Sequence, residues 1–327
     1  MKKYDVVALG ELLIDFTENG TSKQGNPLFE ANPGGAPCNV LAMLNKLGQK
    51  TAFIGKVGKD GFGYQLKETL EETGIDASYL QMDNEVHTTL ALVKKMPDGN
   101  RDFSFYRNPG ADMMLTEEEV PEEIFKEMKL FHFGTLSMTD EKVRAATVKA
   151  LKLAKENHVK ISFDPNLRPP LWKSLEEAKT QTLFGLQYCD ILKISDNEIQ
   201  WLTGCEDFDE GARWIQAKFP NISIILLTMG KDGSKAYTRN YSVYVPGFLQ
   251  EHTIETTGAG DTFCGCMLHA LYDIELSEIS KENQEKKEWL KEKLTFANAG
   301  ASIITTRNGA LRVMPEKDEI EEFVKSR

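Results

Sequence analysis

The sequence predicts an α/β fold in which a mostly parallel sheet is covered by helices on both faces. Short apolar runs of strand length recur along the 327-residue chain. Amphipathic segments with helical spacing of their apolar residues separate most of these runs. One β-rich stretch interrupts this alternation. Because repeated strand–helix–strand order is typical of parallel sheets buried between helices, the alternation predicts the main sheet. The interruption predicts a smaller group of strands beside it.

Six apolar runs predict the buried strands of the main sheet. In chain order they are VVAL at 6–9, TAFIG at 51–55, LFHFG at 130–134, VKISFD at 159–164, DILKIS at 190–195 and SIILLT at 223–228. Helical patterns lie between them. Val40, Leu44 and Leu47 recur at spacings of four and three residues, and Gly48 follows as a candidate C-cap. Two later segments have similar patterns and predict helices at 139–156 and 174–187.

The β-rich stretch consists of two segments that predict a hairpin. Residues 88–96 and 101–108 are rich in strand-forming residues, and PDGN at 97–100 has the composition of a turn. Two earlier segments, 11–16 and 28–35, could add strands to this hairpin. We expect a small β-flap that stands off the main sheet. An ordinary antiparallel edge of the main sheet is the alternative.

Composition and charge argue against several classes of function. The net charge of −11 disfavours nucleic-acid binding, which usually requires a basic surface. The longest apolar stretch, at 222–230, has strand length, whereas a membrane-spanning helix needs ~20 residues. The five cysteines are scattered without a C-x-x-C pair, so neither a zinc site nor a redox motif is indicated. We therefore expect reduced thiols in a cytoplasmic protein.

A glycine-rich turn before a predicted helix is the strongest chemical signal. Gly258, Ala259 and Gly260 precede Asp261, and the apolar residues that follow share one helical face. Helix N-termini present unpaired N–H groups and partial positive charge, and glycines let an anion approach that backbone. The turn could hold a phosphate, with Asp261 beside it as a general base. An ordinary helix start, where Asp and Gly are common, explains these four residues equally well.

Two stretches resemble the signatures of the ribokinase-like (PfkB) carbohydrate kinases. TTGAGDTF at 256–263 is similar to the C-terminal signature, and NPGGAPCNVLAMLNKLG at 32–48 is similar to the N-terminal one. They occur in the order that the family has. The similarity spans essentially the whole chain, through GELLIDF at 10–16, AFIGKVGKDGFG at 52–63, YRNPGADMML at 106–115, FDPNLRPPLW at 163–172, KISDNEIQWLTG at 193–204, LLTMGKDGS at 226–234 and FANAGASIITTRNGA at 296–310. Within the family, these stretches look most like those of fructokinases.

This resemblance implies both a fold and a reaction. The fold is a ribokinase-like three-layer α/β domain over residues 1–327, with a small β lid from discontinuous segments at about 11–33 and 87–112. The reaction is the transfer of the γ-phosphate of ATP to a sugar hydroxyl, with fructose as the expected substrate and fructose 6-phosphate as the product.

The resemblance also assigns residues to the two halves of the reaction. It makes Asp261 the catalytic base and the amides of Gly258, Ala259 and Gly260 the anion hole for the transferred phosphoryl group. The positions that match sugar binding are Asp15, Gly34, Gly35 and Asn39, with Arg107 and Arg168 as cations near a phosphate or an acidic sugar. The positions that match nucleotide binding are Asn166, Ser195, Thr228, Gly230, Lys231, Gly233 and Asn298.

Two positions depart from the family pattern, and both concern metal ions. The family's Asn-x-x-Glu motif is Ser195-Asp196-Asn197-Glu198 here, and Glu198 is expected to contact Mg²⁺ through water. Glu255 stands where the family usually has an Asp that helps to bind a monovalent cation. The resemblance therefore implies K⁺ as a candidate activator, held with the backbone of Gly309, at a site altered by the longer side chain.

Other functions remain as alternatives to fructose phosphorylation. A 2-keto-3-deoxygluconate kinase would use Arg107 and Arg168 to bind a substrate carboxylate. A non-catalytic sugar-binding regulator would not need Asp261 or Glu198. A Rossmann oxidoreductase would need a dinucleotide fingerprint, which the chain lacks. The expected partner is a small sugar, without nucleic acid or membrane, and the exposed flap could pair with a second flap to form a homodimer.

Overall fold

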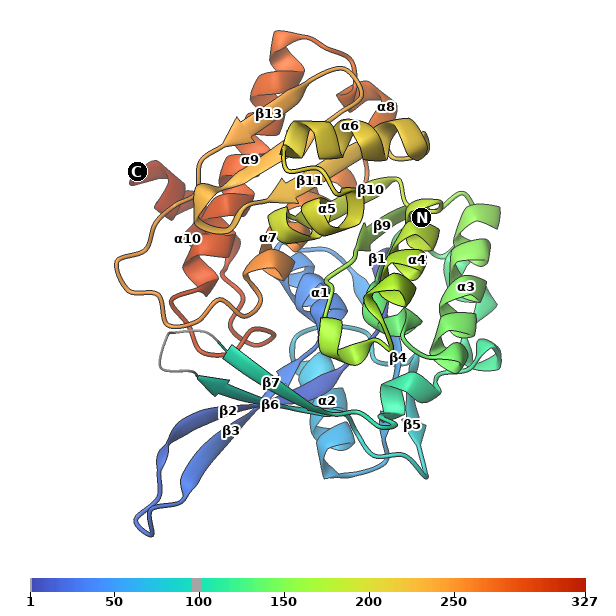
Figure 1. The fold of residues 1–327 in the computed structure, drawn as a ribbon, viewed down its shortest axis with the longest axis vertical. Helices are drawn as coiled ribbons and strands as arrows, with labels where there is room; N and C mark the ends of the chain where they lie inside the picture. The colour runs from blue at the N-terminus through green and yellow to red at the C-terminus, as the bar shows by residue number, and fades with distance from the viewer. Residues whose placement is uncertain (1, 96–100) are drawn as a thin grey trace.

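The computed structural model of the chain describes residues 2–95 and 101–327 (Figure 1). In this part of the chain, the main sheet has the strand order β13-β12-β11-β10-β9-β8-β1-β4-β5. Its strands are β1 Tyr4–Leu9, β4 Thr51–Gly58, β5 Leu80–Asp83, β8 Met128–Gly134, β9 Lys160–Asp164, β10 Ile191–Ser195, β11 Ile224–Thr228, β12 Ser234–Tyr237 and β13 Ser242–Val245. Strands β11 to β5 of this order pair in parallel. Strands β12 and β13 add an antiparallel edge.

The strand order reverses at the centre of the main sheet. From β1 the chain builds outward to β4 and β5, whereas β8 lies on the other side of β1 and leads outward to β9, β10 and β11. In open α/β sheets, the carboxyl ends of the strands at such a reversal border a crevice where ligands bind. The topology therefore points to the carboxyl ends of β1, β8, β9 and β10 as the place of a site.

Helices cover both faces of the main sheet, as the sequence predicted. They are α1 Ala36–Lys46, α2 Gly61–Glu72, α3 Glu141–Glu156, α4 Leu175–Leu186, α5 Asp196–Thr203, α6 Phe208–Lys218, α7 Ala259–Leu271, α8 Leu276–Ile279, α9 Gln284–Ile304 and α10 Lys317–Lys325. Side chains of each strand alternate between two cores. Val6 and Ala8 face the core with α1, α2, α7 and α9, whereas Val7 and Leu9 face the core with α3, α4, α5 and α6.

A second sheet has the order β3-β2-β6-β7 in the described residues. Its strands are β2 Leu13–Thr21, β3 Pro27–Gly34, β6 Leu90–Lys95 and β7 Arg101–Tyr106. Figure 1 shows this sheet at the lower end of the molecule, with the β2–β3 hairpin extending away from the helices. Strand β2 pairs antiparallel with β3, which places Asp15 opposite Asn32, and parallel with β6. The turn predicted at 97–100 lies outside the described residues.

Three strands of the main sheet have no counterpart among the predicted strands. Strands β5, β12 and β13 have four residues each, and β13 is largely accessible to solvent. A run of four residues is too short to show a clear apolar periodicity. The stretch at 280–294 is rich in charged residues and lies mostly within the 21-residue helix α9.

Candidate active site

The glycine turn forms the N-terminus of α7. Gly258 is the N-cap, and its φ of 77° lies in the left-handed region that favours glycine. Asp261 lies in the first turn of the helix and is 9% exposed. The amide of Ala259 donates to the carbonyl of Thr256 at 3.3 Å, and the amide of Thr262 donates to that of Gly258 at 2.7 Å. Three amides are expected to form the anion hole. One of them, that of Ala259, already makes a long hydrogen bond within the turn.

Asn39 connects the base candidate to the N-terminal half of the chain. Its Nδ2 donates a hydrogen bond of 2.8 Å to Oδ2 of Asp261, which joins α1 to α7. The other polar atom of the amide, Oδ1, is buried and has no hydrogen-bond partner in the described structure. A buried acceptor without a partner is costly, so this oxygen is a natural acceptor for a ligand hydroxyl. Asn39 thus orients the carboxylate of Asp261 and keeps a second polar atom available beside it.

The glycine pair before α1 allows two close backbone approaches. Gly35 has a φ of 133°, and a Cβ there would lie 2.4 Å from the carbonyl oxygen of Glu11. A Cβ on Gly34 would lie 2.5 Å from Oδ2 of Asp15. Asp15 is therefore packed directly over the backbone of Gly34.

A buried ion pair lies beneath the glycine turn, and the sequence did not predict it. Nζ of Lys193 on β10 lies 3.0 Å from Oδ2 of Asp164 at the end of β9, with both side chains almost fully buried. A Cβ on Gly260 would lie 3.1 Å from Nζ of Lys193. Burial by itself would lower the pKa of Lys193, but the neighbouring acidic groups, Asp164 foremost, outweigh burial and raise it. The signal in the sequence was a lysine inside the apolar run DILKIS.

Burial raises the pKa of Asp261 above its usual value of about 4, because a charged carboxylate loses hydration there. The hydrogen bond from Asn39 and the charges of Lys193 and Arg168 oppose this rise. A base must be ionised to accept a proton, so with Asp261 as the base we expect activity to fall as the pH drops through this raised pKa. The rate should therefore decline at a higher pH than an exposed aspartate would give.

We expect Lys193→Met to move this acidic limb to higher pH. Loss of the cation removes one of the forces that keep Asp261 ionised, so its pKa rises further. Lys193→Arg keeps the charge and serves as the control. The measurement is kcat/KM as a function of pH for the three proteins. An acidic limb at the same pH in all of them would contradict the electrostatic link between Lys193 and Asp261.

Glu198 is held at the N-terminus of α5. Its Oε2 accepts hydrogen bonds from the backbone N and Oγ of Ser195 at 2.8 and 2.7 Å, and its Oε1 accepts from the backbone N of Leu167 at 2.7 Å. Both carboxylate oxygens are thus engaged within the protein, which suits an outer contact through water better than direct metal ligation. The Leu167 bond also fixes the loop that carries Asn166, with a φ of 44°, and Arg168.

Four of the predicted nucleotide-binding residues lie at or after the end of β11, and a fifth, Asn298, lies in the second half of α9. Thr228 ends β11, and Gly230 and Lys231 are exposed in the turn after it. Gly233 has a φ of 97°, and a Cβ there would lie 2.2 Å from the carbonyl oxygen of Val245. Asn298 on α9 donates from Nδ2 to the carbonyls of Val245 and Pro246, both at 3.2 Å. Asn298 therefore supports the chain after β13, with its amide nitrogen engaged by the backbone.

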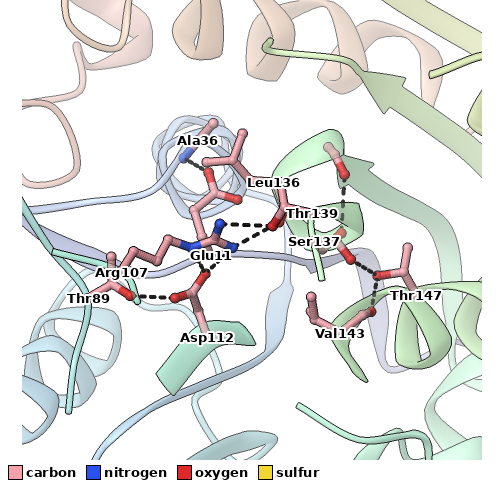
Figure 2. A network of polar contacts seen from close by, with 11 residues as sticks. Glu11, Ala36, Thr89, Arg107, Asp112, Leu136, Ser137, Thr139, Val143 and Thr147 are labelled. Carbon is pink, nitrogen blue, oxygen red and sulfur yellow. Dashed lines mark hydrogen bonds and ion pairs between the residues drawn. The ribbon is translucent and has the colours of Figure 1, made fainter. Parts of the chain in front are cut away.

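Arg107 lies in a buried polar network rather than free beside the sugar positions (Figure 2). Its Nε donates to Oδ2 of Asp112 at 2.8 Å, and the Arg107 and Asp112 side chains are both 2% exposed. Nη1 donates to Oγ1 of Thr139 at 2.9 Å, and Nη2 donates to the carbonyl of Leu136 at 3.0 Å. This arrangement could not be predicted from the sequence, because Leu136 and Thr139 belong to a segment about 30 residues further along the chain.

Glu255 and Gly309, the two positions expected at a cation site, are in direct contact. The Gly309 amide donates to Oε1 of Glu255 at 2.9 Å, and Glu255 is 5% exposed. A cavity of about 20 Å³ lies between these residues and the second sheet, with Asp15, Asn32 and Thr257 among its lining residues. In residues 2–95 and 101–327, no group of three or more His, Cys, Asp or Glu side chains is arranged to hold a metal ion. Any cation here would need backbone, hydroxyl or nucleotide oxygens as well.

Comparisons with known proteins all indicate the same family. The family model described as pfkB family carbohydrate kinase matches residues 3–317. Fructokinase-2 of Solanum lycopersicum is 40% identical over 316 residues, which cover 96% of this chain and 94% of that protein. Fructokinase-1 of Zea mays is 40% identical over 321 residues, covering 98% and 97%.

Solved structures give the same fold. The fructokinase with bound ATP from Xylella fastidiosa aligns with a TM-score of 0.87 and 28% identity over 99% of each chain. A fructokinase double mutant from Vibrio cholerae O395, with fructose, ADP and potassium ion bound, aligns with a TM-score of 0.86 and 28% identity over 99% of each chain. Separately, the helices among the described residues are all too short or too polar to cross a bilayer.

Proposed function

We propose that this chain, which belongs to the pfkB family of carbohydrate kinases, transfers the γ-phosphoryl group of ATP to fructose and forms fructose 6-phosphate. One observation carries the proposal most directly. A buried carboxylate, Asp261, lies at the N-terminus of α7 and is oriented by Asn39 from the glycine-containing start of α1. A proton acceptor therefore lies beside a positive helix end, which is the arrangement that phosphoryl transfer to a hydroxyl requires.

The residues of this chain then have distinct roles in the reaction. Asp15 and Asn39 bind sugar hydroxyls, with the sugar lying against Gly34 and Gly35. The carboxylate of Asp261 accepts the proton of the attacking hydroxyl while the oxygen–phosphorus bond forms and ADP leaves. The N-terminal amides of α7 face the negative charge of the transferred group, which they stabilise without reorganisation.

ATP and Mg²⁺ complete the proposed site. Mg²⁺ bound with the nucleotide neutralises phosphate charge during transfer. Because the oxygens of Glu198 already accept hydrogen bonds from Ser195 and Leu167, we propose that Glu198 orders water around the ion. The turn at 230–233 would bind the nucleotide phosphates. The segment after β13, which Asn298 supports, would lie beside the adenine ring.

The test of the proposed function is substrate preference in an assay coupled to ADP release. We expect kcat/KM for fructose to exceed that for 2-keto-3-deoxygluconate at least about tenfold, equivalent to ~1.4 kcal/mol. An acidic sugar needs a cation, and the guanidinium of Arg107 is bonded to Asp112, Thr139 and Leu136. Of the two cations expected near the substrate, this leaves Arg168 for such a contact. Preference for the keto-acid would identify the other kinase, and absence of ADP release with any sugar would identify a regulator.

A monovalent cation is proposed at the Glu255 position. The carboxylate bonded to the Gly309 amide lies on the loop that leads into the glycine turn, so a cation there would stabilise the anion hole. We expect kcat to fall several-fold when K⁺ is replaced by tetramethylammonium at constant ionic strength. Glu255→Gln should make the rate less sensitive to this exchange. Equal rates in both salts would show that the longer side chain fills the cation site.

The second sheet is proposed as the lid, since Asp15 lies on it and the cavity at Glu255 lies beneath it. Among its described side chains, the large apolar ones that are exposed include Leu28, Phe29 and Tyr106. These support its proposed use as a homodimer contact, which sedimentation velocity would test. All five cysteines are free thiols, which supports the proposed cytoplasmic location.

A further inference from the structure

The chain passes between the main body and the second sheet at four places in the described residues. These are the links from β1 to β2 at 10–12, from β3 to α1 at residue 35, from β5 to β6 at 84–89, and from β7 to the following 3₁₀-helix at 107–110. Contacts among these four links determine the position of the second sheet relative to the main sheet. The side chains at the links therefore bear on the geometry of the whole site.

The four links form two pairs, the first with the second and the third with the fourth. In each pair a buried carboxylate connects one link to the other. Glu11, in the first link, accepts a 3.0 Å hydrogen bond at Oε1 from the backbone N of Ala36, directly after the second. Asp112, directly after the fourth link, accepts hydrogen bonds from Oγ1 of Thr89 in the third link and from Arg107 in the fourth. Glu11 is 4% exposed and Asp112 3% exposed, so water does not compete for either carboxylate.

Arg107 then fixes the second pair of links to the main body. The guanidinium binds Asp112 with Nε and Nη2, at 2.8 and 2.7 Å. Its remaining contacts go to Thr139 and to the carbonyl of Leu136, which follow β8 of the main sheet (Figure 2). A planar guanidinium makes these bonds only in a fixed relative geometry. The space is also restricted, since a Cβ on Gly110 would lie 1.8 Å from Oγ1 of Thr89.

The same network reaches the sugar-binding strand through the backbone. The carbonyl of Thr89 accepts a 3.2 Å hydrogen bond from the amide of Ile14. Ile14 precedes Asp15 on β2, and Asp15 lies opposite Ala91 of β6. A continuous series of contacts therefore leads from β8, through Arg107, Asp112 and Thr89, to the neighbour of Asp15.

We propose that Arg107 and Asp112 are positioning residues that fix the base of the second sheet, and through it Asp15, relative to Asp261. The inference rests on the proposed function, since it assumes that Asp15 binds the sugar. The proposal gives a positioning role to Arg107, which the sequence analysis had assigned to the substrate. Misplacement of a substrate by about 1 Å can cost as much as 10²-fold in rate, so the base of the sheet is a sensitive point.

The test separates positioning from stability with three variants, Arg107→Met, Asp112→Leu and the double variant. Each single variant leaves one buried charge without its partner and should lower the melting temperature clearly. The double variant removes both charges and should recover most of the loss, because apolar replacements of buried ion pairs are often neutral. Its KM for fructose should nevertheless stay raised about tenfold, while its KM for ATP should stay within about twofold of wild type.

Two controls make the outcome decisive. Arg144→Met removes the partly buried pair with Glu177, away from the second sheet, and should leave the KM for fructose unchanged. Arg107→Lys keeps the charge without the planar group and should fall between wild type and Arg107→Met. Recovery of the KM for fructose together with the melting temperature in the double variant would overturn the proposal, as would an equal rise in the KM for ATP. Wild-type turnover of fructose tests the proposed function separately.

Discussion

Asp261→Asn is expected to lower kcat for fructose about 10²–10⁴-fold, the loss typical of a missing general base. The substitution keeps the size of the side chain and an oxygen that can accept the hydrogen bond from Asn39, but it removes the basicity. Sugar affinity should change only modestly, because the hydroxyl contacts of Asp15 and Asn39 remain. Pre-steady-state turnover and calorimetric titration with fructose would measure the two effects separately.

An acidic residue in the first turn of a helix can stabilise the helix through its dipole and have no catalytic role. Asp318 occupies such a position in α10, and Asp318→Asn is the matched control. Removal of a charge that acts only on a helix dipole costs ~0.3–1 kcal/mol of stability and should leave turnover unchanged. If Asp261→Asn behaved like this control, Asp261 would be a helix-start residue and the proposed mechanism would lose its base.

Asp15→Ala should have the second largest effect, a fall of about 10²-fold in kcat/KM for fructose. A hydrogen bond to a charged group is worth ~1.5–3 kcal/mol, and each ~1.4 kcal/mol is tenfold, so the loss of one or two such bonds gives this size. The fall should come mainly from KM for fructose, and KM for ATP should stay near its wild-type value. Initial rates over a matrix of both substrates would show this division.

Gly34→Ala offers an independent route to the same outcome. A Cβ on Gly34 would lie 2.5 Å from Oδ2 of Asp15, so the methyl group must displace the carboxylate. We expect its kinetic signature to match that of Asp15→Ala. Wild-type fructose kinetics in both variants would remove Asp15 from the sugar site.

Much of the architecture could be predicted because its signals are local. The buried strands are continuous apolar runs, and the flanking helices have apolar residues at spacings of three and four. The glycines before α1 and α7 are equally visible, since φ values of 133° at Gly35 and 77° at Gly258 favour that residue. The mostly parallel sheet between helices was confirmed, with each predicted strand found in the main sheet.

What could not be predicted depends on partners distant in sequence. Period-two alternation shows that Lys193 faces the same side of the sheet as Ile191, but nothing local identifies Asp164 as its partner. Arg107 looks like a surface or substrate-binding cation until Asp112, Leu136 and Thr139 are brought around it. Tertiary contacts of this kind determine whether a charge is available to a ligand, and a sequence pattern does not contain them.

The contact between Asn39 and Asp261 also sets the time at which the site first exists during synthesis. The two residues are 222 positions apart, and β1, although made first, lies at the centre of the sheet between β4 and β8. At ~5–20 residues per second, a ribosome needs about 10–45 s to add that interval. Throughout this time the α1 face that will receive α7 has no covering helix, and its apolar residues lack their final packing partners. A ribosome-bound chain stalled before residue 259 should therefore expose the α1 face to a protease that leaves the finished enzyme intact.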